Sequence, residues 1–397
     1  MRSLFGSLLI TLAVTAVAAP VIENGDRPLN GRETLHLKEV WRIGGDDDEH
    51  LLGLIGKAVA DAQGNVYLLD SQLIEVQVFA PDGAYLTTLG REGDGPGELR
   101  RPRDLILLPD GTVGLVEGFP GRIVKIDMDG IPAGVMHPGG DPTEGGHFAI
   151  TKAEAAGPHL VMGAADITRG EGRRISRNAI AGFSRAGERL VEYLVVTNIR
   201  EAASTVRAEI DRFVPSAWSL GPDGRVWIPP HRNEYRIDVY RPDGKLERSI
   251  TRDYESYRRT QDEMETVKRF MTPWGGRNRG RFEVRVEETE RDIMVTRVDE
   301  RGRLWVLSSR GAHPVEDGVH SVWDVFDADG RFDRQVAIAC EGRAYDDGLQ
   351  FAGNGIVIVV KGSMAAREAL RGRAGGDEDD DEDVGALEVI CYRIEGI

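Results

Sequence analysis

The sequence predicts an all-β fold, a six-bladed β-propeller whose blades are four-stranded antiparallel sheets. Two observations predict it. A unit of two hairpins with glycine turns recurs along the chain, and the last copy lacks a strand that a segment near the N-terminus can supply. Repeats of this length bury their apolar faces by packing on their neighbours, and a closed ring leaves no unpaired sheet edge at its ends.

The first unit comprises residues 58–70 and 74–89, two strand–turn–strand segments with turn glycines at Gly64 and Gly83. Short β-rich segments separated by glycine turns are typical of hairpins. The pattern returns in residues 104–130, where both turn glycines are displaced by 47 residues. This displacement shows that the whole unit, and not only one hairpin, is repeated.

Four further copies complete the array, and the first of these four, which is the third copy along the chain, is degenerate. These copies comprise residues 160–163 with 179–187, 218–228 with 235–246, 294–306 with 323–332, and 349–360 with 387–396. The last copy stops at its second turn, and residues 35–43 occupy the position of the missing outer strand. We therefore expect residues 35–43 to pair with residues 387–394 and to close a propeller that spans residues 35–397. A two-sheet sandwich does not explain these offset ends.

The N-terminus predicts export. Residues 1–18 combine Arg2, an apolar run over Leu8–Val17 and a final small-residue tripeptide, which is the pattern of a secretory signal peptide. We expect cleavage near Ala18, a periplasmic or extracellular location, and a linker over residues 19–34. The apolar run is too short for a membrane anchor, and no later segment approaches the required length, so no membrane span is predicted.

Charge and cysteine content narrow the possible partners. The 397 residues include 50 Lys and Arg against 66 Asp and Glu, a net charge of −16, which argues against binding to nucleic acid. Arginine is abundant throughout, and its abundance alone identifies no ligand. Cys340 and Cys391 are too few for a disulfide scaffold, and their 51-residue separation leaves open whether they pair.

Two sequence features, together with the expected ring closure, carry a family resemblance. The linker Gly90–Leu99 and the first-hairpin signature, seen at residues 61–68 and 299–306, resemble bacterial six-bladed propellers related to NHL repeats, the TolB-like propellers. The resemblance spans about residues 35–397 and implies the propeller fold. Such propellers include binding scaffolds, lactonases and lyases, so the resemblance leaves the function open.

The insertions all fall on one predicted face. The first-to-second and third-to-fourth strand turns are short, and the long connections are residues 137–146, 164–177, 198–216, 253–292, 308–320 and 361–386. Loops on a rigid scaffold usually carry function, so we expect the ligand surface there. A helical insert is expected at about residues 253–290, with a capping box at Thr260–Glu263 and a stripe formed by Met264, Val267, Phe270 and Met271. This helix is either a lid over the channel or a packing element.

Two possible channel metal sites were considered. Peptidyl-hydroxyglycine lyases, which this chain resembles at the level of NHL propellers, hold zinc with histidines from different blades, and the candidates here are His147, His231 and His313. No local motif matches, so we expect three independent loop histidines. Gluconolactonase-like propellers hold calcium with a set of Glu, Asn and Asp, for which the candidates are Asp70, Glu117 and Asn233. No catalytic or cofactor-binding residue is assigned.

Two acidic runs, Asp46–Glu49 and Asp377–Asp383, are placed by the repeat pattern on the insertion face in neighbouring positions. Their fields would add, and a weak calcium site is one interpretation. Its candidate ligands are Asp46, Asp47, Asp48, Asp377, Asp379, Asp380 and Asp381. The other interpretation is a pair of solvated loop tips.

These features together predict an exported, monomeric binding or interaction scaffold. Its ligand, a protein or a small molecule, would bind on the insertion face, and no cofactor is required, although calcium is possible. The alternative is a metal-dependent propeller enzyme, either an NHL-type lyase or a gluconolactonase-like hydrolase.

Overall fold

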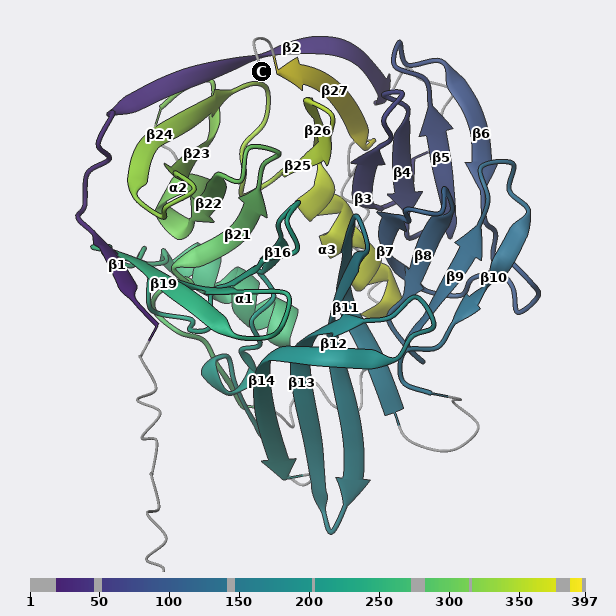
Figure 1. Cartoon of the computed structure of the whole chain (residues 1–397), viewed down its shortest axis with the longest axis horizontal. Helices are drawn as coiled ribbons and strands as arrows, with labels where there is room; N and C mark the ends of the chain where they lie inside the picture. Colours follow the sequence, from purple (N-terminus) through teal and green to yellow (C-terminus); the bar gives the residue numbers. More distant parts are fainter. Residues whose placement is uncertain are drawn as a thin grey trace, which may run out of the picture.

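The computed structural model describes residues 19–45, 52–140, 147–201, 204–272, 283–313, 316–375 and 386–394. These residues form an all-β, propeller-like arrangement of sheets around a centre, with helices confined to connections (Figure 1). The predicted signal peptide and both acidic runs lie outside the described residues. Within the described part of the chain, none of the helices combines the length and apolar character needed to cross a lipid bilayer.

The first three repeats form three separate four-stranded antiparallel sheets, as expected from the turn glycines. The first sheet contains β3 (Ile55–Ala60), β4 (Val66–Asp70), β5 (Glu75–Phe79) and β6 (Tyr85–Leu89). The second contains β7 (Pro102–Leu107), β8 (Val113–Glu117), β9 (Arg122–Ile126) and β10 (Pro132–Met136). The third, the degenerate copy, has the longest strands of the three: β11 (His147–Ala156), β12 (His159–Gly170), β13 (Arg173–Phe183) and β14 (Arg189–Glu201).

The fourth repeat gains a strand from the N-terminus. Its own strands are β16 (Ser219–Leu220), β17 (Val226–Ile228), β18 (Arg236–Tyr240) and β19 (Leu246–Arg252). β1 (Val21–Asn24) pairs in parallel with β19 and makes this sheet five-stranded. Residues 19–34, expected as a linker, therefore contain a strand of their own and the start of a second one.

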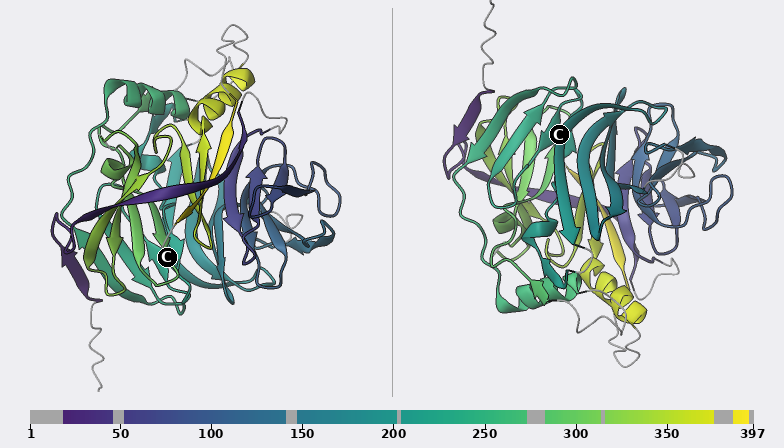
Figure 2. Two further views of the ribbon diagram at one scale, coloured as in Figure 1. Left: turned by 90° about the horizontal axis from the view of Figure 1, so that it is seen from above. Right: turned by 90° about the horizontal axis from the view of Figure 1, so that it is seen from below.

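That second strand, β2 (Arg32–Gly44), joins the last two repeats into one eight-stranded sheet. The fifth repeat supplies β21 (Ile293–Val298), β22 (Leu304–Ser308), β23 (Val319–Phe326) and β24 (Phe332–Ala339), and the sixth supplies β25 (Gly348–Gly353), β26 (Ile356–Lys361) and β27 (Glu388–Ile394). The first part of β2 pairs in parallel with β24, from Arg32 opposite Gln335 onward. The second part pairs antiparallel with β27, from Leu37 opposite Ile394 onward. β2 runs as a long ribbon across the outside of these sheets (Figure 2).

The prediction of six separate four-stranded blades is wrong. Four sheets stand alone as blades, three with four strands and one with five, and the remaining repeats share a single eight-stranded sheet. The predicted pairing of residues 35–43 with 387–394 is present, but the closure differs from the prediction, because the same strand also pairs with β24. A strand of 13 residues is long enough to reach two sheet edges, and a repeat pattern does not reveal how many edges one strand covers.

Helices occupy the long connections and lie on one side of the ring, where Figure 2 shows α1 (Gln261–Met271) and α3 (Ser363–Gly375) together. α1 begins at Thr260 with the predicted capping box, and its apolar stripe is half-buried. α3 was not predicted, because residues 361–386 were expected to form an acidic loop. α2 (Ser309–Ala312), the 3-10 turn η2 (Ile210–Arg212) and the parallel pair β15 (Val206–Ala208) with β20 (Glu283–Arg285) complete this layer.

The core consists of apolar layers between consecutive sheets. Leu68 and Phe79 of the first sheet pack with Ile358 and Val389 of the last repeat, so the two ends of the array share one buried cluster. Each fully buried side chain of this kind contributes about 1.5–3 kcal/mol of transfer free energy. Trp41 of β2 joins the same cluster, with its ring centroid 5.6 Å from that of Phe79. The N-terminal strand therefore belongs to the core as well as to the edge.

Candidate functional site

Ionic and aromatic side chains from separate connections meet on the insertion face. We name the His313 cluster for its five members, His313, Tyr257, Tyr345, Glu263 and Glu290. They come from the connection that contains α1, from the end of α2, and from the connection between β24 and β25. Residues far apart in the sequence thus form one compact group.

The imidazole of His313 is held on all sides. Its Nε2 lies 3.0 Å from a carboxylate oxygen of Glu290, and its Nδ1 lies 3.4 Å from one of Glu263. The ring of Tyr257 stacks on it with a centroid distance of 4.1 Å and an interplanar angle of 4°. Tyr345 covers it at 5.1 Å with a tilt of 42°. The orientation of the imidazole is therefore fixed by two carboxylates and two rings.

Local chain geometry places these groups. His313 is the C-cap residue of α2, whose N-cap Ser308 accepts a hydrogen bond from the backbone N–H of Gly311. Glu263 is the third residue of α1, where its carboxylate accepts a hydrogen bond from the backbone N–H of Thr260 at 2.7 Å. The same carboxylate accepts a hydrogen bond from the hydroxyl of Tyr257 at 3.1 Å. One glutamate therefore caps the helix and also orients the cluster.

Buried ion pairs adjoin the cluster, because a guanidinium nitrogen of Arg259 lies 3.9 Å from a carboxylate oxygen of Glu290. The carboxylate of Glu209 accepts hydrogen bonds from the guanidinium groups of Arg232 at 2.6 Å and Arg259 at 2.7 Å, and from the backbone N–H of Glu287 at 3.0 Å. Both guanidinium side chains are almost fully buried. Burial alone would raise the pKa of Glu209, but the hydrogen bonds from Arg259, Arg232 and Glu287 together lower it. Glu209 is thus held as an anion between two arginines.

The cluster is mostly buried, and an exposed ion pair lies beside it. The side chains of His313, Glu263 and Glu290 are 12–15% exposed. Arg258 and Glu288 form an ion pair nearby that is 79% exposed on both sides. Burial and the carboxylate of Glu263 raise the pKa of Tyr257 to about 12, so this phenol is a neutral hydrogen-bond donor near pH 7. The site thus offers aromatic edges, fixed donors and acceptors at the surface.

The structure places the three candidate histidines apart in the fold. His147 is exposed at the start of β11 and faces the ring of Phe119 at a centroid distance of 5.7 Å. His231 is exposed in the connection after β17, with Nε2 3.6 Å from a carboxylate oxygen of Glu234. His313 alone belongs to the cluster. Within the described ranges, no three His, Cys, Asp or Glu side chains group in a way that could hold a metal ion.

The candidate calcium ligands make internal hydrogen bonds. Asp70 accepts hydrogen bonds from four backbone N–H groups, those of Gly53, Leu54, Gln72 and Leu73, at 2.6–3.1 Å. Glu117, at the matching end of β8, accepts one from the backbone N–H of Arg100 at 2.6 Å and pairs with Arg122. The Oδ1 of Asn233 accepts a hydrogen bond from Arg232 at 2.7 Å. Asp70 and Glu117 thus fix the connections that precede the inner strands.

Both cysteines are free thiols, so the open question of their pairing is answered in favour of separate thiols. Cys391 is buried on β27 and Cys340 is partly buried beyond β24. Burial raises the pKa of each thiol to about 12, so the reactive thiolate is scarce near pH 7.

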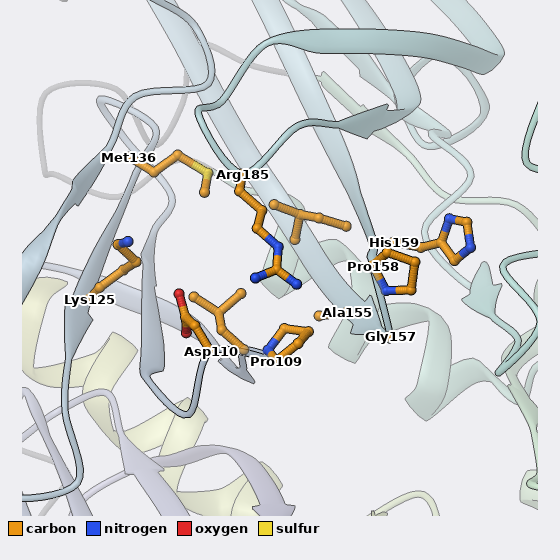
Figure 3. Close-up of a pocket in the computed structure, with 11 residues that line it drawn as sticks. Pro109, Asp110, Lys125, Met136, Ala155, Gly157, Pro158, His159 and Arg185 are labelled. Carbon is orange, nitrogen blue, oxygen red and sulfur yellow. The ribbon is translucent and has the colours of Figure 1, made fainter.

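A shallow pocket lies on the opposite face, between the second and third sheets (Figure 3). Short turns form it, and its polar lining includes Asp110, Lys125, His159 and Arg185. Hydrogen bonding from Thr112 lowers the pKa of Asp110, and the positive charges of Lys125 and Arg185 act in the same direction. The pocket has space for about one or two water molecules. It is therefore a minor feature beside the His313 cluster.

Sequence reasoning identified part of this site. It found the insertion, the capping box that fixes Glu263, and His313 as a loop residue of that face. It missed the roles of Tyr257, Glu290 and Tyr345. The only local signal was the capping box, because the contact between Tyr345 and His313 joins connections from different repeats.

Comparisons with known proteins describe the fold only. No family model and no curated protein matches the chain. Among solved structures, a putative exported protein from Bacteroides fragilis is 11% identical, with a TM-score of 0.49 over 95% of this chain and 100% of that chain. A member of the DUF4221 family from Bacteroides vulgatus is 11% identical, with a TM-score of 0.47 over 92% and 99%. A gluconolactonase from Xanthomonas campestris is 12% identical, with a TM-score of 0.44 over 86% and 87%.

Proposed function

We propose that the protein is an exported binding scaffold whose ligand surface lies on the insertion face, centred on the His313 cluster. One observation carries the proposal: separate connections converge on the insertion face to hold one imidazole between two carboxylates and two tyrosine rings, and 12–15% of the imidazole and carboxylate side chains is exposed. The ligand is a protein segment or a small molecule with polar groups that match this surface.

The support beneath the cluster favours binding over mere loop anchorage. Burying Arg232, Arg259 and Glu209 removes charges from water, and apolar side chains of similar volume could pack a loop at no such cost. A rigid ionic support is useful where surface groups must keep a fixed geometry. Tyrosine is also enriched at recognition surfaces.

The experiment is a thermal-shift screen of the purified protein against a defined panel of amino acids, dipeptides and neutral and acidic sugars. We expect at least one compound to raise the melting temperature of the wild-type protein in a saturable way. The variants Tyr257→Phe, which removes only the hydroxyl, and His313→Gln should weaken that shift. The matched control is Arg185→Ala in the shallow pocket of the opposite face, which should leave the shift unchanged.

Two outcomes would contradict the proposal. If compounds stabilise wild type, His313→Gln and Tyr257→Phe equally, the ligand surface is elsewhere. If elemental analysis after dialysis finds one equivalent of zinc or calcium per chain, the metal-dependent enzyme becomes the better hypothesis. Thermal unfolding of each variant without ligand establishes that the compared proteins are folded.

A further inference from the structure

Three arginines lie directly opposite one another at the end of the third sheet. Arg169 of β12 is the register partner of Arg174 of β13, and Arg174 is the register partner of Arg200 of β14. Directly opposed residues of antiparallel strands point to the same face, with Cα atoms about 4.5–5.5 Å apart. We call these three residues the arginine ladder.

The charges of the arginine ladder are not neutralised by ion pairs. Across the described ranges, none of its three side chains forms an ion pair or a hydrogen bond with another residue. Like charges directly opposite one another destabilise a sheet. The chain has 66 acidic residues and a net charge of −16, yet none of the carboxylates that the structure describes pairs with the ladder.

The opposite face of the same strands shows the contrast. There Asp166 of β12 lies 3.0 Å from Arg189, and Arg177 of β13 lies 2.6 Å from Glu192 of β14. Next to the ladder, Arg173 pairs with Glu201 at 2.8 Å, also on the opposite face. One face therefore alternates charge sign in the usual way, and the other does not.

Two further arginines lie near Arg200, the ladder residue on the edge strand β14. Asn198, on the same face of β14 as Arg200, donates a hydrogen bond to the backbone carbonyl of Asp211 at 3.3 Å and so holds η2 against this face. η2 carries Arg212, and Arg207 lies nearby on β15. Burial lowers the pKa of Arg200, as do the positive charges of Arg212, Arg174 and Arg207, whereas Asp211 opposes this effect.

We propose that the arginine ladder, together with Arg212, binds a ligand with at least two adjacent phosphate or sulfate groups. A guanidinium group donates two parallel hydrogen bonds to such an oxyanion. Rungs about 5 Å apart allow neighbouring arginines to share one anionic group and the next rung to reach the following one. The anion supplies the negative charge that is missing beside the ladder on this face of the sheet. This site is separate from the His313 cluster, and the inference does not depend on the proposed function.

The key comparison uses neighbouring arginines on opposite faces. Arg174→Ser removes the middle rung, and Arg173→Ser removes the same charge from the paired, opposite face. The probes are inorganic phosphate, pyrophosphate and dextran sulfate, titrated by calorimetry at low salt. We expect pyrophosphate or dextran sulfate to bind the wild-type protein saturably, and inorganic phosphate to bind more weakly. Arg174→Ser should weaken binding about tenfold or more, and Arg173→Ser less than about twofold.

The two probes distinguish the sources of the ligand. Binding of both pyrophosphate and dextran sulfate, or of pyrophosphate alone, supports a ladder that accepts a short ligand, and binding of dextran sulfate alone supports one that reads a polymer. Equal weakening by Arg174→Ser and Arg173→Ser would show a diffuse charge effect and would overturn the proposal. Failure of both multivalent probes to bind would overturn it as well.

Stability without ligand is a second readout. Because Arg174→Ser removes repulsion and breaks no ion pair, its melting temperature should equal or exceed that of the wild-type protein. Arg173→Ser, which breaks a pair, should not be more stable than wild type. A fall in the melting temperature of Arg174→Ser would indicate that the ladder serves the fold, and it would contradict the proposal.

Discussion

The two sides of the ring differ in whether a further strand pairs with the outer edge of each sheet. The first three sheets end at β6, β10 and β14, which are terminal strands with no further strand beside them among the described residues. The later sheets are covered by the N-terminal strap, which we define as residues 19–45 with β1 and β2. Leu86 on β6 is 51% exposed, whereas Ile250 on the covered β19 is fully buried. One N-terminal segment therefore pairs with the outer strands of three repeats.

Single side chains carry much of this sealing. The amide of Asn24 donates to the carbonyls of Thr251 at 3.0 Å and Gly330 at 3.1 Å, and its oxygen accepts from the N–H of Phe332 at 2.8 Å. Trp41 reaches the first sheet and packs on Phe79. The strap therefore links neighbouring sheets through its side chains as well as through its backbone.

The largest effect is expected from removing the strap. Deleting residues 19–45 should expose β19, β24 and β27 as unpaired edges and remove Trp41 from the core. We expect a loss comparable to the stability of a typical domain, about 5 kcal/mol or more, with aggregation. Size-exclusion chromatography and calorimetry measure it. A truncated protein with the melting temperature of the full chain would show that the strap does not stabilise the sheets with which it pairs.

We expect low pH to destabilise the sheets that pair with the strap. His320 of β23 is fully buried, and burial lowers its pKa from 6.5 to about 4, although Asp347 opposes the shift. The unfolded chain therefore binds a proton at higher pH than the folded chain does. The contribution of His320 to the free energy of unfolding should therefore be largest above pH 6.5 and should fall by up to about 3 kcal/mol as the pH drops to 4.

Denaturant unfolding at several pH values tests this expectation, with His320→Gln as the variant that should have a smaller slope between pH 6.5 and 4. Hydrogen exchange should reveal opening around β23 before the first three sheets. An unchanged slope in His320→Gln would assign the acid sensitivity to other groups.

Gly83 and Gly130 are turn glycines at equivalent positions of two repeats. Substituting each of them separates the destabilising effect of a clash with the strap from the effect of backbone strain. Gly83 and Gly130 have φ values of +90° and +81°, so alanine is strained at both. A Cβ at Gly83 would lie 2.7 Å from Trp41, whereas one at Gly130 would meet only Leu89 at 3.7 Å. We expect Gly83→Ala to be more destabilising than Gly130→Ala by about 1–3 kcal/mol. Urea unfolding measures the difference, which should disappear when Trp41→Ala is also present.

An expected effect of similar size concerns Asn24. Asn24→Ala leaves the backbone N–H of Phe332 without its partner and should cost about 1–3 kcal/mol of unfolding free energy. Asn30→Ala is the control, because it removes only an exposed hydrogen bond from the Asn30 side-chain amide to the carboxylate of Asp333, and it should change stability by less than about 0.5 kcal/mol. Equal effects of the two substitutions would show that the side-chain hydrogen bonds of Asn24 do not stabilise the strap.

Local features of the sequence were reliable guides to the fold. The turn glycines located the hairpins, and Thr260 with Glu263 located the start of α1. Hairpins and caps depend on residues within a few positions of each other, so the sequence displays them directly. The site was less visible, since Tyr257, Glu290 and Tyr345 gain their roles only from contact with His313.

The repeated hairpins, the side of the ring that carries the insertions, and the pairing of residues 35–43 with 387–394 could all be predicted from the amino-acid sequence. Only the tertiary structure decided that β2 also pairs with β24, that β1 extends the fourth sheet, and that Arg169, Arg174 and Arg200 face the same way. The physical reason is the difference between local and long-range contacts. Turn chemistry is encoded within a few residues, whereas strand register and edge pairing depend on which surfaces remain uncovered once the sheets have packed.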